Sequence, residues 1–349
     1  MIKRRQTRRI YVGGVSIGDG APVRVQSMTK TDTRNIKATI RQIKQLELAG
    51  CEIVRVAVPD ITAAKVLGEI KKRIKIPMIA DIHFNYKLAL EAIKQGVDGL
   101  RINPGNIGAK WKVREVITAA KDRKIPIRIG VNAGSLPKDL IEKYGHPTHE
   151  AMVEAAERHI EILEELDFHD IKVSLKASDV MKTVEAYRLF SSKHDYPLHI
   201  GITETGPVPE GVVKSSIGIG LLLLEGIGDT IRVSLTDSPV VEVNVAYEIL
   251  RVTGFREKGV EIISCPTCGR CEVNIKKMVK QVKNALRNVK EPIKVAVMGC
   301  SVNGPGEAKE ADFGIAGGKG QGIVFVKGKI LKTVKETELV NALIEEIRK

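Results

Sequence analysis

The chain has 349 residues, of which 43% are hydrophobic and 4% aromatic, and its formal net charge is +14. This apolar content suffices for one or two hydrophobic cores and excludes an intrinsically disordered chain. No apolar run approaches the roughly 18 residues that a membrane-spanning helix needs. The basic N-terminal segment lacks the apolar centre of a signal peptide. We therefore expect a soluble, cytoplasmic protein.

Short runs rich in β-branched residues alternate with segments of helical periodicity. The eight predicted strands are residues 23–29, 53–59, 78–84, 99–103, 127–132, 171–176, 198–205 and 230–235. The predicted helices include residues 36–49, 61–73, 86–95 and 152–166. Residues 132–150 form a loop insertion after the fifth strand. Eight successive βα units favour a closed TIM-type (β/α)8 barrel over a doubly wound open sheet.

The ends of the predicted strands carry polar residues where barrel enzymes place their chemistry. These residues are Arg55, Asp81, His83, Arg101, Asn103, Arg128, Asn132, Lys176, Glu204, Arg232 and Ser234. A single arginine there is more often a structural ion pair. Four arginines and a lysine on separate strands are costly unless an anion compensates them. Because arginine pairs bidentately with phosphate oxygens, the set predicts a diphosphate or similar polyanion.

The pattern changes after residue 258, which predicts a barrel over residues 1–258 and a smaller α/β domain over residues 259–349. A predicted strand, 260–263, runs into a cysteine-containing loop and then a helix whose apolar stripe begins at Ile275. A second strand, 293–298, also leads into a loop. A hairpin of residues 323–326 and 329–333 and a terminal helix, 336–348, complete the domain.

Four of the five cysteines, Cys265, Cys268, Cys271 and Cys300, lie in this smaller domain. A cytosolic chain of this size rarely uses disulfides, so the clustering indicates a metal or cluster site. Cys265 and Cys268 with the distant Cys300 could hold zinc or an iron–sulfur cluster. Cys265, Cys268 and Cys271 also follow the C-x2-C-x2-C spacing of bacterial ferredoxins, which with Cys300 would give an all-thiolate electron-transfer site.

Glu307 suggests a different fourth ligand. It follows Cys300 by seven residues, in a loop bent by glycine and proline that could curl the carboxylate back. A carboxylate is a hard ligand on a soft cluster and is easily displaced. One iron would then be open to a substrate oxygen as a Lewis acid. In isolation, such a residue is more often an ordinary surface acid.

Several segments together resemble the 4-hydroxy-3-methylbut-2-enyl diphosphate synthase family, the reductive ring-opening enzymes of the non-mevalonate isoprenoid pathway. They are VQSMTKTDT, ADIHF, RINPGN, TETG, EGIGDTIRVSLT, SCPTCGR and MGCSVNGPGEA. The likeness spans nearly the whole chain, and the length is similar to the common bacterial form. It implies a TIM-type barrel joined to an α/β iron–sulfur domain that resembles a reductase module and carries one [4Fe–4S] cluster.

The resemblance also implies the roles of individual residues. The cluster ligands would be Cys265, Cys268, Cys300 and Glu307. Cys271 stands where the family usually has threonine and would lie outside the ligand set. The diphosphate-binding residues would be Arg55, His83, Arg101, Asn103, Arg128, Asn132, Lys176, Arg232 and Ser234. The implied catalytic residues are Glu204, which matches the acid beside the reacting carbons, Asp81 near it, and Glu307.

The implied reaction converts 2-C-methyl-D-erythritol 2,4-cyclodiphosphate to (E)-4-hydroxy-3-methylbut-2-enyl diphosphate. The cluster would bind the substrate and supply two electrons. Family members are homodimers in which the cluster domain of one subunit caps the barrel of the other. The chain lacks a dinucleotide-binding fingerprint, because the glycine-rich residues 317–322 precede a hairpin. Electrons would come from an acidic flavodoxin or ferredoxin, which suits residues 264–349 with their 16 Lys and Arg against 9 Asp and Glu.

Two other functions compete with this interpretation. A corrinoid or pterin methyl-transfer protein also combines a barrel with an iron–sulfur centre, but its barrel would not need five cations. A cluster-containing nucleic-acid binder would explain the net charge, but the chain lacks interleaved aromatic residues for base stacking. His146 and His149 have metal-like spacing but lie in the proline-containing insertion, which favours a surface loop. We expect neither a nucleic-acid nor a membrane partner.

Overall fold

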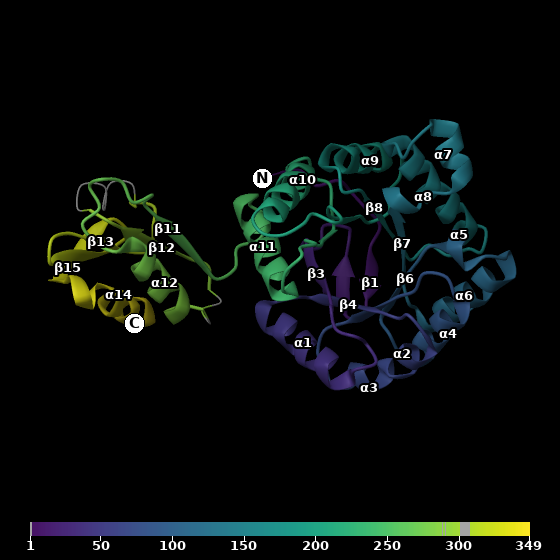
Figure 1. Cartoon of the computed structure of the whole chain (residues 1–349), viewed down its shortest axis with the longest axis horizontal. Coiled ribbons are helices and arrows are strands. Elements are labelled where there is room, and N and C mark those ends of the chain that lie inside the picture. The colour runs from purple at the N-terminus through teal and green to yellow at the C-terminus, as the bar shows by residue number, and fades with distance from the viewer. Residues whose placement is uncertain (1, 288, 290, 301–307) are drawn as a thin grey trace. The chain divides into compact units, whose positions relative to one another are not determined.

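The computed structural model describes residues 2–287, 289, 291–300 and 308–349 (Figure 1). It divides the chain into two compact units, Met1–Arg256 and Glu257–Lys349. The first unit contains eight parallel strands in the order β8-β7-β6-β5-β4-β3-β10-β9. These strands are β3 (Arg24–Met28), β4 (Ile53–Ala57), β5 (Met78–Asp81), β6 (Gly99–Ile102), β7 (Ile127–Asn132), β8 (Ile171–Lys176), β9 (His199–Ile200) and β10 (Thr230–Ile231). A parallel bridge between Val173 and Leu198 closes the ring, which confirms the predicted TIM-type barrel.

Helices cover the outside of the barrel (Figure 1). They are α1 (Ile36–Ala49), α2 (Ile61–Lys65), α3 (Leu67–Lys71), α4 (Tyr86–Lys94), α5 (Pro104–Ile107), α6 (Lys110–Arg123), α7 (Lys138–Tyr144), α8 (His149–Glu164), α9 (Val180–Lys193), α10 (Glu210–Leu224) and α11 (Pro239–Val252). The single helix predicted over residues 61–73 is wrong, because the chain forms two short helices that meet at Val66. Valine and the nearby Gly68 are weak helix formers. No helix in the described part of the chain is long and apolar enough to cross a lipid bilayer.

Along each strand, side chains point alternately to the hydrophobic core outside the strands and to the interior of the barrel. On β8, Ile171, Val173 and Leu175 are buried and belong to the main hydrophobic core. Lys172 and Lys176 alternate with them and therefore face the interior of the barrel. The apolar residues supply the packing energy, so the inward positions are available for polar groups.

The predicted strands 198–205 and 230–235 are shorter in the structure, where β9 and β10 each span two residues. Backbone pairing continues beyond them in irregular form, with Arg232 N donating to Ile200 O at 3.1 Å and Thr203 N to Ala177 O at 3.2 Å. These irregular segments carry the polar residues of the barrel mouth. They bend away from a regular ladder as the chain turns into the loops.

A hairpin that the sequence analysis missed closes the other end of the barrel. Its strands β1 (Ile10–Val12) and β2 (Val15–Ile17) pair in antiparallel fashion and pack against Ile53 and Ile79 at the starts of β4 and β5. Each strand has three residues, which is too short for a two-residue alternation to be recognised. The hairpin shields the N-terminal ends of the strands from water.

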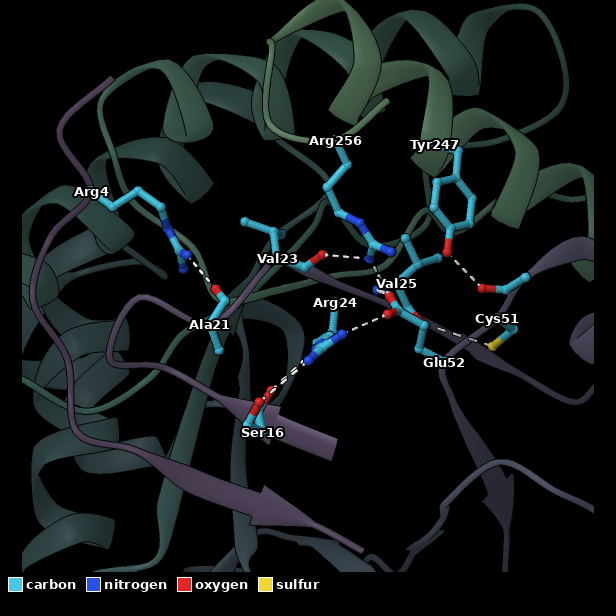
Figure 2. Close-up of polar contacts among 11 residues, drawn as sticks. Arg4, Ser16, Ala21, Val23, Arg24, Val25, Cys51, Glu52, Tyr247 and Arg256 are labelled. Atoms are coloured by element: carbon cyan, nitrogen blue, oxygen red, sulfur yellow. Dashed lines mark hydrogen bonds and ion pairs between the residues drawn. The ribbon is translucent and has the colours of Figure 1, made fainter. Parts of the chain in front are cut away.

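Glu52 organises a polar network beside this end of the barrel (Figure 2). Its two carboxylate oxygens accept hydrogen bonds from Arg24 at 3.0 Å, from Arg256 at 2.6 Å and from Val25 N at 2.8 Å. Arg256 is the last residue of the first unit, so this contact anchors the end of that unit to β3. Burial raises the pKa of the neighbouring Cys51 to about 12, as expected for a core thiol rather than a reactive one.

The insertion over residues 132–150 is not a simple loop, so that prediction is wrong. It contains a 3-10 turn, Ala133–Ser135, and α7, and α8 already begins at His149. Thr148 Oγ1 caps α8 by accepting a hydrogen bond from Ala151 N at 3.1 Å. The His149 ring lies 3.2 Å from a Glu150 oxygen and 3.3 Å from a Glu185 oxygen, so it links α8 to α9.

The second unit is a mixed sheet with helices. Its strands are β11 (Val260–Ser264), β12 (Ile293–Met298), β13 (Phe313–Gly317), β14 (Gln321–Val326) and β15 (Lys329–Lys335), adjacent in that order. The first three are parallel and the last three antiparallel. The helices are α12 (Ile275–Ala285) and α14 (Leu339–Arg348), with a 3-10 turn at Glu336–Glu338. Strand β13 was not predicted, because two of its five residues are glycines, which are depleted in strands.

The closure of the barrel between β8 and β9 depends on a buried tyrosine. Tyr187 on α9 is fully buried; its hydroxyl donates to His199 O at 2.6 Å and accepts from Leu175 N at 3.1 Å. The change Tyr187→Phe leaves both backbone groups unpaired, so we expect a loss of about 1–3 kcal/mol in the free energy of unfolding. Urea unfolding followed by tryptophan fluorescence measures it, because the single tryptophan, Trp111, lies in the barrel unit.

The exposed Tyr11 on β1 provides the matched control for this experiment. The change Tyr11→Phe also removes one hydroxyl group but should alter stability by less than about 0.5 kcal/mol. Equal losses in the two variants would show that Tyr187 does not hold the β8–β9 junction together.

Candidate functional site

Five cationic side chains from four strands and the segment after β10 gather inside the barrel. They are Arg55 on β4, Arg101 on β6, Arg128 on β7, Lys176 on β8 and Arg232 just after β10. Arg101, Arg128 and Lys176 are at most 7% exposed. Burial and the neighbouring cations, Arg232 first among them, lower the pKa of Lys176 well below its ordinary value. The structure thus brings together all five cations that the sequence analysis placed at the mouth.

Glu242 on α11 is a buried carboxylate that attracts Arg55 and Arg232. A second buried carboxylate, Asp81 on β5, lies among the cations themselves. Its Oδ1 is 3.3 Å from Arg101 Nη1 and 3.6 Å from His83 Nε2, and its Oδ2 is 3.6 Å from Arg55 Nε. Burial raises the pKa of Asp81, but Arg55, His83 and Arg101 more than offset this and hold that pKa well below its usual range. Asp81 is therefore ionised at neutral pH and balances only part of the positive charge.

Several donors in this cluster lack a good acceptor. Arg55 directs Nη2 and Nε at the sulfur of Met28, 2.8 and 3.1 Å away, and a thioether is only a weak acceptor. Among the residues that the structure describes, Arg128 Nε and Nη1, Arg101 Nε and Arg232 Nε have no hydrogen-bond partner. Buried cations in this state are destabilising unless an anion joins them. An anion at the mouth of the barrel would supply the acceptors that these donors lack.

Two glycines provide room for the cations, and neither was recognised from the sequence. A Cβ atom at Gly130 on β7 would lie 2.5 Å from Arg101 Nε. A Cβ atom at Gly201, after β9, would lie 2.9 Å from Lys176 Nζ. Because any side chain at either position would displace a charged group, these glycines shape the site.

His199 on β9 is a further interior residue that the sequence analysis missed. It is fully buried, and its Nδ1 lies 2.8 Å from Thr230 Oγ1. Burial and the nearby Lys176 lower its pKa well below the ordinary value, so the imidazole is neutral. Its alternation with the outward-facing Ile200 and Ile202 is the sequence signal that could have found it.

Lys172 extends the cationic interior toward the closed end of the barrel. It is 1% exposed, and its Nζ has no hydrogen-bond partner in the described ranges. Together with Arg128 it lines a cavity of about 10 Å³, which is close to the space that one water occupies. Lys172 therefore adds to the positive charge around Arg128.

The remaining predicted mouth residues are more accessible. Asn103 is buried, Asn132 and Ser234 are half-buried, and His83 and Glu204 are exposed. Glu204 forms no hydrogen bond or ion pair with any residue of the described chain, and the structure gives it no direct contact with Asp81. It adopts φ +52°, an uncommon left-handed conformation for a residue other than glycine. Thr205 Oγ1 donates to Ser234 O at 2.5 Å, which fixes the loop that presents Glu204.

The cysteines lie on two loops that leave the same edge of the second sheet. β11 and β12 are parallel neighbours with Ser264 beside Val297, so Cys265 and Cys300 both follow the carboxyl ends of adjacent strands. A Cβ atom at Gly299 would lie 3.3 Å from Cys265 Sγ and 2.5 Å from Cys271 Sγ, so this glycine leaves an open cradle beside the sulfurs. Glu307, the predicted fourth ligand, lies outside the described residues.

Cys268 and Cys271 differ in their surroundings. Cys268 is exposed, and a backbone hydrogen bond from Arg270 lowers its pKa, which favours the thiolate form that binds metals. Cys271 is half-buried, and its Sγ donates a hydrogen bond to Val273 O at 3.1 Å.

The cysteine donors are compatible with an iron–sulfur cluster. Each iron of a [4Fe–4S] cluster takes its own protein ligand, so its thiolates can come from two different loops. Cys265 and Cys268 on one loop and Cys300 after the neighbouring strand meet that requirement, and Gly299 leaves space beside the sulfurs. Across the described residues, which omit Glu307, no three His, Cys, Asp or Glu side chains converge on one point.

Comparison with known proteins agrees with this arrangement. Residues 7–247 match the family model of the GcpE TIM-barrel domain, and residues 261–349 match that of the GcpE protein C-terminal domain. The 4-hydroxy-3-methylbut-2-en-1-yl diphosphate synthase (flavodoxin) of Geobacter sulfurreducens is 58% identical over 344 residues, 99% of this chain and 98% of the relative. The protein of that name from Clostridium acetobutylicum is 58% identical over 346 residues, 99% of both chains.

Solved structures share the fold of the first unit at low sequence identity. The dihydropteroate synthase of Yersinia pestis has a TM-score of 0.50 and 12% identity, and the match covers 70% of this chain and 98% of that one. At this identity the likeness shows the fold alone. The two family models and the close relatives confirm the resemblance seen in the sequence: the chain belongs to the GcpE family.

Proposed function

We propose that the chain catalyses the two-electron reductive ring opening of 2-C-methyl-D-erythritol 2,4-cyclodiphosphate to (E)-4-hydroxy-3-methylbut-2-enyl diphosphate, a step of isoprenoid synthesis. The observation that carries the proposal is the buried cluster of five cations with two carboxylates, in a chain whose relatives carry this enzyme's name. A cyclic diphosphate supplies the negative charge that these cations lack.

The reaction balances with groups that the chain presents. The C2–oxygen bond to the diphosphate breaks, the C3–hydroxyl bond breaks, and a C2–C3 double bond forms. The dianionic substrate takes up two electrons and one proton and yields the trianionic product and water. A [4Fe–4S] cluster held by Cys265, Cys268, Cys300 and Glu307 would supply the single-electron chemistry when bound. The protein's own residues must bind the diphosphate, stabilise its new charge and deliver the proton.

The cations perform the electrostatic part of this work. When the ring opens, the diphosphate gains one negative charge, and preorganised positive groups in a low-dielectric site stabilise such charge strongly. Further hydrogen-bonding side chains at the mouth complete the diphosphate site. These side chains are His83, Asn103, Asn132 and Ser234. Asp81, as a carboxylate between Arg55 and Arg101, orients these two guanidinium groups and holds no proton to give.

Glu204 is placed to handle the proton. It is exposed at the mouth, and the hydrogen bond from Thr205 to Ser234 fixes the backbone beside it. A carboxyl group at this position can deliver a proton to the leaving C3 hydroxyl as a general acid. This assignment separates the two acids: Asp81 positions cations and Glu204 transfers the proton.

The electron donor and the assembly complete the proposal. The relatives are named for flavodoxin, which is the donor we propose here as well. We further propose a homodimer in which the cysteine-bearing unit of one subunit caps the barrel of the other. The exposed His83 and Glu204 leave the mouth able to receive such a cap.

The proposal is tested by anaerobic turnover of the cyclodiphosphate in the parent protein and in Arg128→Met. Methionine removes the charge while keeping much of the volume, so we expect the dissociation constant of the substrate to rise about 10- to 100-fold. The same change relieves repulsion among buried cations, so the ligand-free variant should be more stable by about 1–4 kcal/mol. Titration calorimetry and urea unfolding measure the two effects.

The control for this experiment is Arg123→Met, at the exposed end of α6. It removes the same charge from the surface and should leave affinity and iron content unchanged. If Arg128→Met bound the substrate as tightly as the parent, the barrel mouth would not be the diphosphate site. A parent protein with its cluster but without turnover would contradict the proposed reaction.

Substrate binding should take up protons. Burial lowers the pKa of Lys176 in the free protein, and a bound dianion favours the charged amine and raises that pKa. At a pH between the two values, binding adds a proton, so affinity falls as the pH rises. The phosphates of the cyclic substrate are strongly acidic and do not titrate there. Calorimetry in two buffers of different ionisation enthalpy counts the protons.

Lys176→Met is the informative variant for this linkage. It should bind the substrate more weakly, with less proton uptake and a flatter dependence of affinity on pH. Unchanged proton uptake in the variant would assign the linkage to another group, such as His199.

The cysteine assignment predicts unequal effects of two conservative changes. Cys268→Ser removes an exposed thiolate ligand and should abolish the binding of about four irons per chain. Cys271→Ser removes a thiol already bonded to Val273 O and should retain the iron and sulfide. Iron and sulfide analysis after anaerobic reconstitution distinguishes them. Loss of the cluster in Cys271→Ser alone would support the ferredoxin-like all-thiolate arrangement instead.

A further inference from the structure

One face of α12 carries a row of positive charge. The residues of the helix that pack into the core of the second unit are Ile275, Met278 and Val282. The exposed cations are Lys276, Lys277, Lys280, Lys283 and, in the turn after the helix, Arg287. The spacing of 276, 280, 283 and 287 places these four on one side, away from the buried stripe. We call these five residues the α12 cation row.

No acidic residue on α12 balances the positive charges of the row. None of the five side chains forms an ion pair or hydrogen bond with another residue in the described part of the chain, and α12 contains no acidic residue. Like charges four residues apart destabilise a helix. Helix stability alone therefore disfavours this sequence.

Several surface cations on helices of the barrel unit form ion pairs with acidic residues. Lys110 pairs with Glu165 at 3.1 Å, and Lys143 pairs with Glu154 at 2.7 Å. Arg188 on α9 pairs with Glu225. Each of these cations has an acidic partner, whereas the side chains of the α12 cation row have none among the described residues.

The row begins beside the cysteine loop. Asn274 caps α12 by accepting a hydrogen bond from Lys277 N at 3.0 Å, three residues after Cys271. Cys265 and Cys271 pack against the same core as the buried face of the helix. The α12 cation row therefore marks a surface next to the cysteines, on the same compact unit.

We propose that the α12 cation row is the docking surface for an acidic, flavin-bearing electron-transfer protein. The inference rests on the proposed function and names the place where its electron donor binds. Complementary charge accelerates encounter and orients the partners, which suits the small and short-lived interfaces of electron transfer. Such an interface weakens as salt screens the charges.

The test compares two reductants on the full chain with its cluster. In the variant K276E/K280E/K283E, we expect kcat/KM for reduced flavodoxin to fall at least tenfold at low ionic strength. The rate with reduced methyl viologen, a small cationic reductant, should stay within twofold of the parent rate. The dependence of the flavodoxin reaction on salt should flatten in the variant.

A matched control carries the same change in net charge on other elements of the unit. The variant K309E/K329E/K335E alters three exposed lysines, two of them on β15, and should retain most of the flavodoxin rate. Equal losses in the two variants would overturn the proposal, because attraction would then follow net charge rather than this surface. A loss with both reductants in the α12 variant would also overturn it.

A binding measurement separates this proposal from the proposed function. Titration of flavodoxin into the parent protein and into both variants reports docking without turnover. Binding lost only in the α12 variant supports the docking surface even if the cyclodiphosphate proves not to be the substrate. Equal binding by all three proteins overturns the docking surface even if the synthase reaction is confirmed.

Discussion

The constraint on which the barrel depends is incompletely compensated positive charge in its interior. Burying a cation is unfavourable unless an anion or polar partners replace water, and here two buried carboxylates, Asp81 and Glu242, act on five cations, with Lys172 as a further buried cation. The opposite face of each strand packs into a continuous apolar core, and this packing energy offsets the cost of the buried charge. Gly130 and Gly201 give the cations space to spread apart. An anionic ligand of the proposed kind would supply the acceptors that these cations lack.

The two ends of the barrel differ in how their charged side chains are paired. At the closed end, Glu52 pairs with Arg24 and Arg256, while Lys172 has no hydrogen-bond partner among the described residues. At the open end, Arg128 retains unpaired donors, and Arg55 has only a thioether beyond its share of Asp81. Stability and ligand binding therefore occupy different ends of the strands. Substitutions at the closed end should act on folding, and those at the mouth on affinity.

The sequence predicts the repeated βα pattern well because alternation and helical periodicity are local signals. It places Arg128 and Lys176 on the inward face, since both alternate with isoleucine, valine or leucine. His199 could have been found by the same argument. The β1–β2 hairpin could not, because three-residue strands carry too little pattern. Gly130 and Gly201 have no signal of their own, because their importance comes from Arg101 and Lys176 on neighbouring strands. Strand β13 was not predicted, because glycine is depleted in strands and two of the five residues of β13 are glycines.

The buried cations and four of the five cysteines lie in different units, and electrostatics explains why this separation is useful. A thiolate beside five buried cations would form ion pairs with them and compete with the diphosphate for the same donors. Conversely, cations packed against Cys265 or Cys300 would draw negative charge away from any metal those thiolates bind. With the thiols on a separate sheet, Cys271 is held by a neutral carbonyl, that of Val273, and the positive charge of this unit lies outside on α12. The proposed anion site, metal centre and docking surface therefore occupy three different parts of the chain.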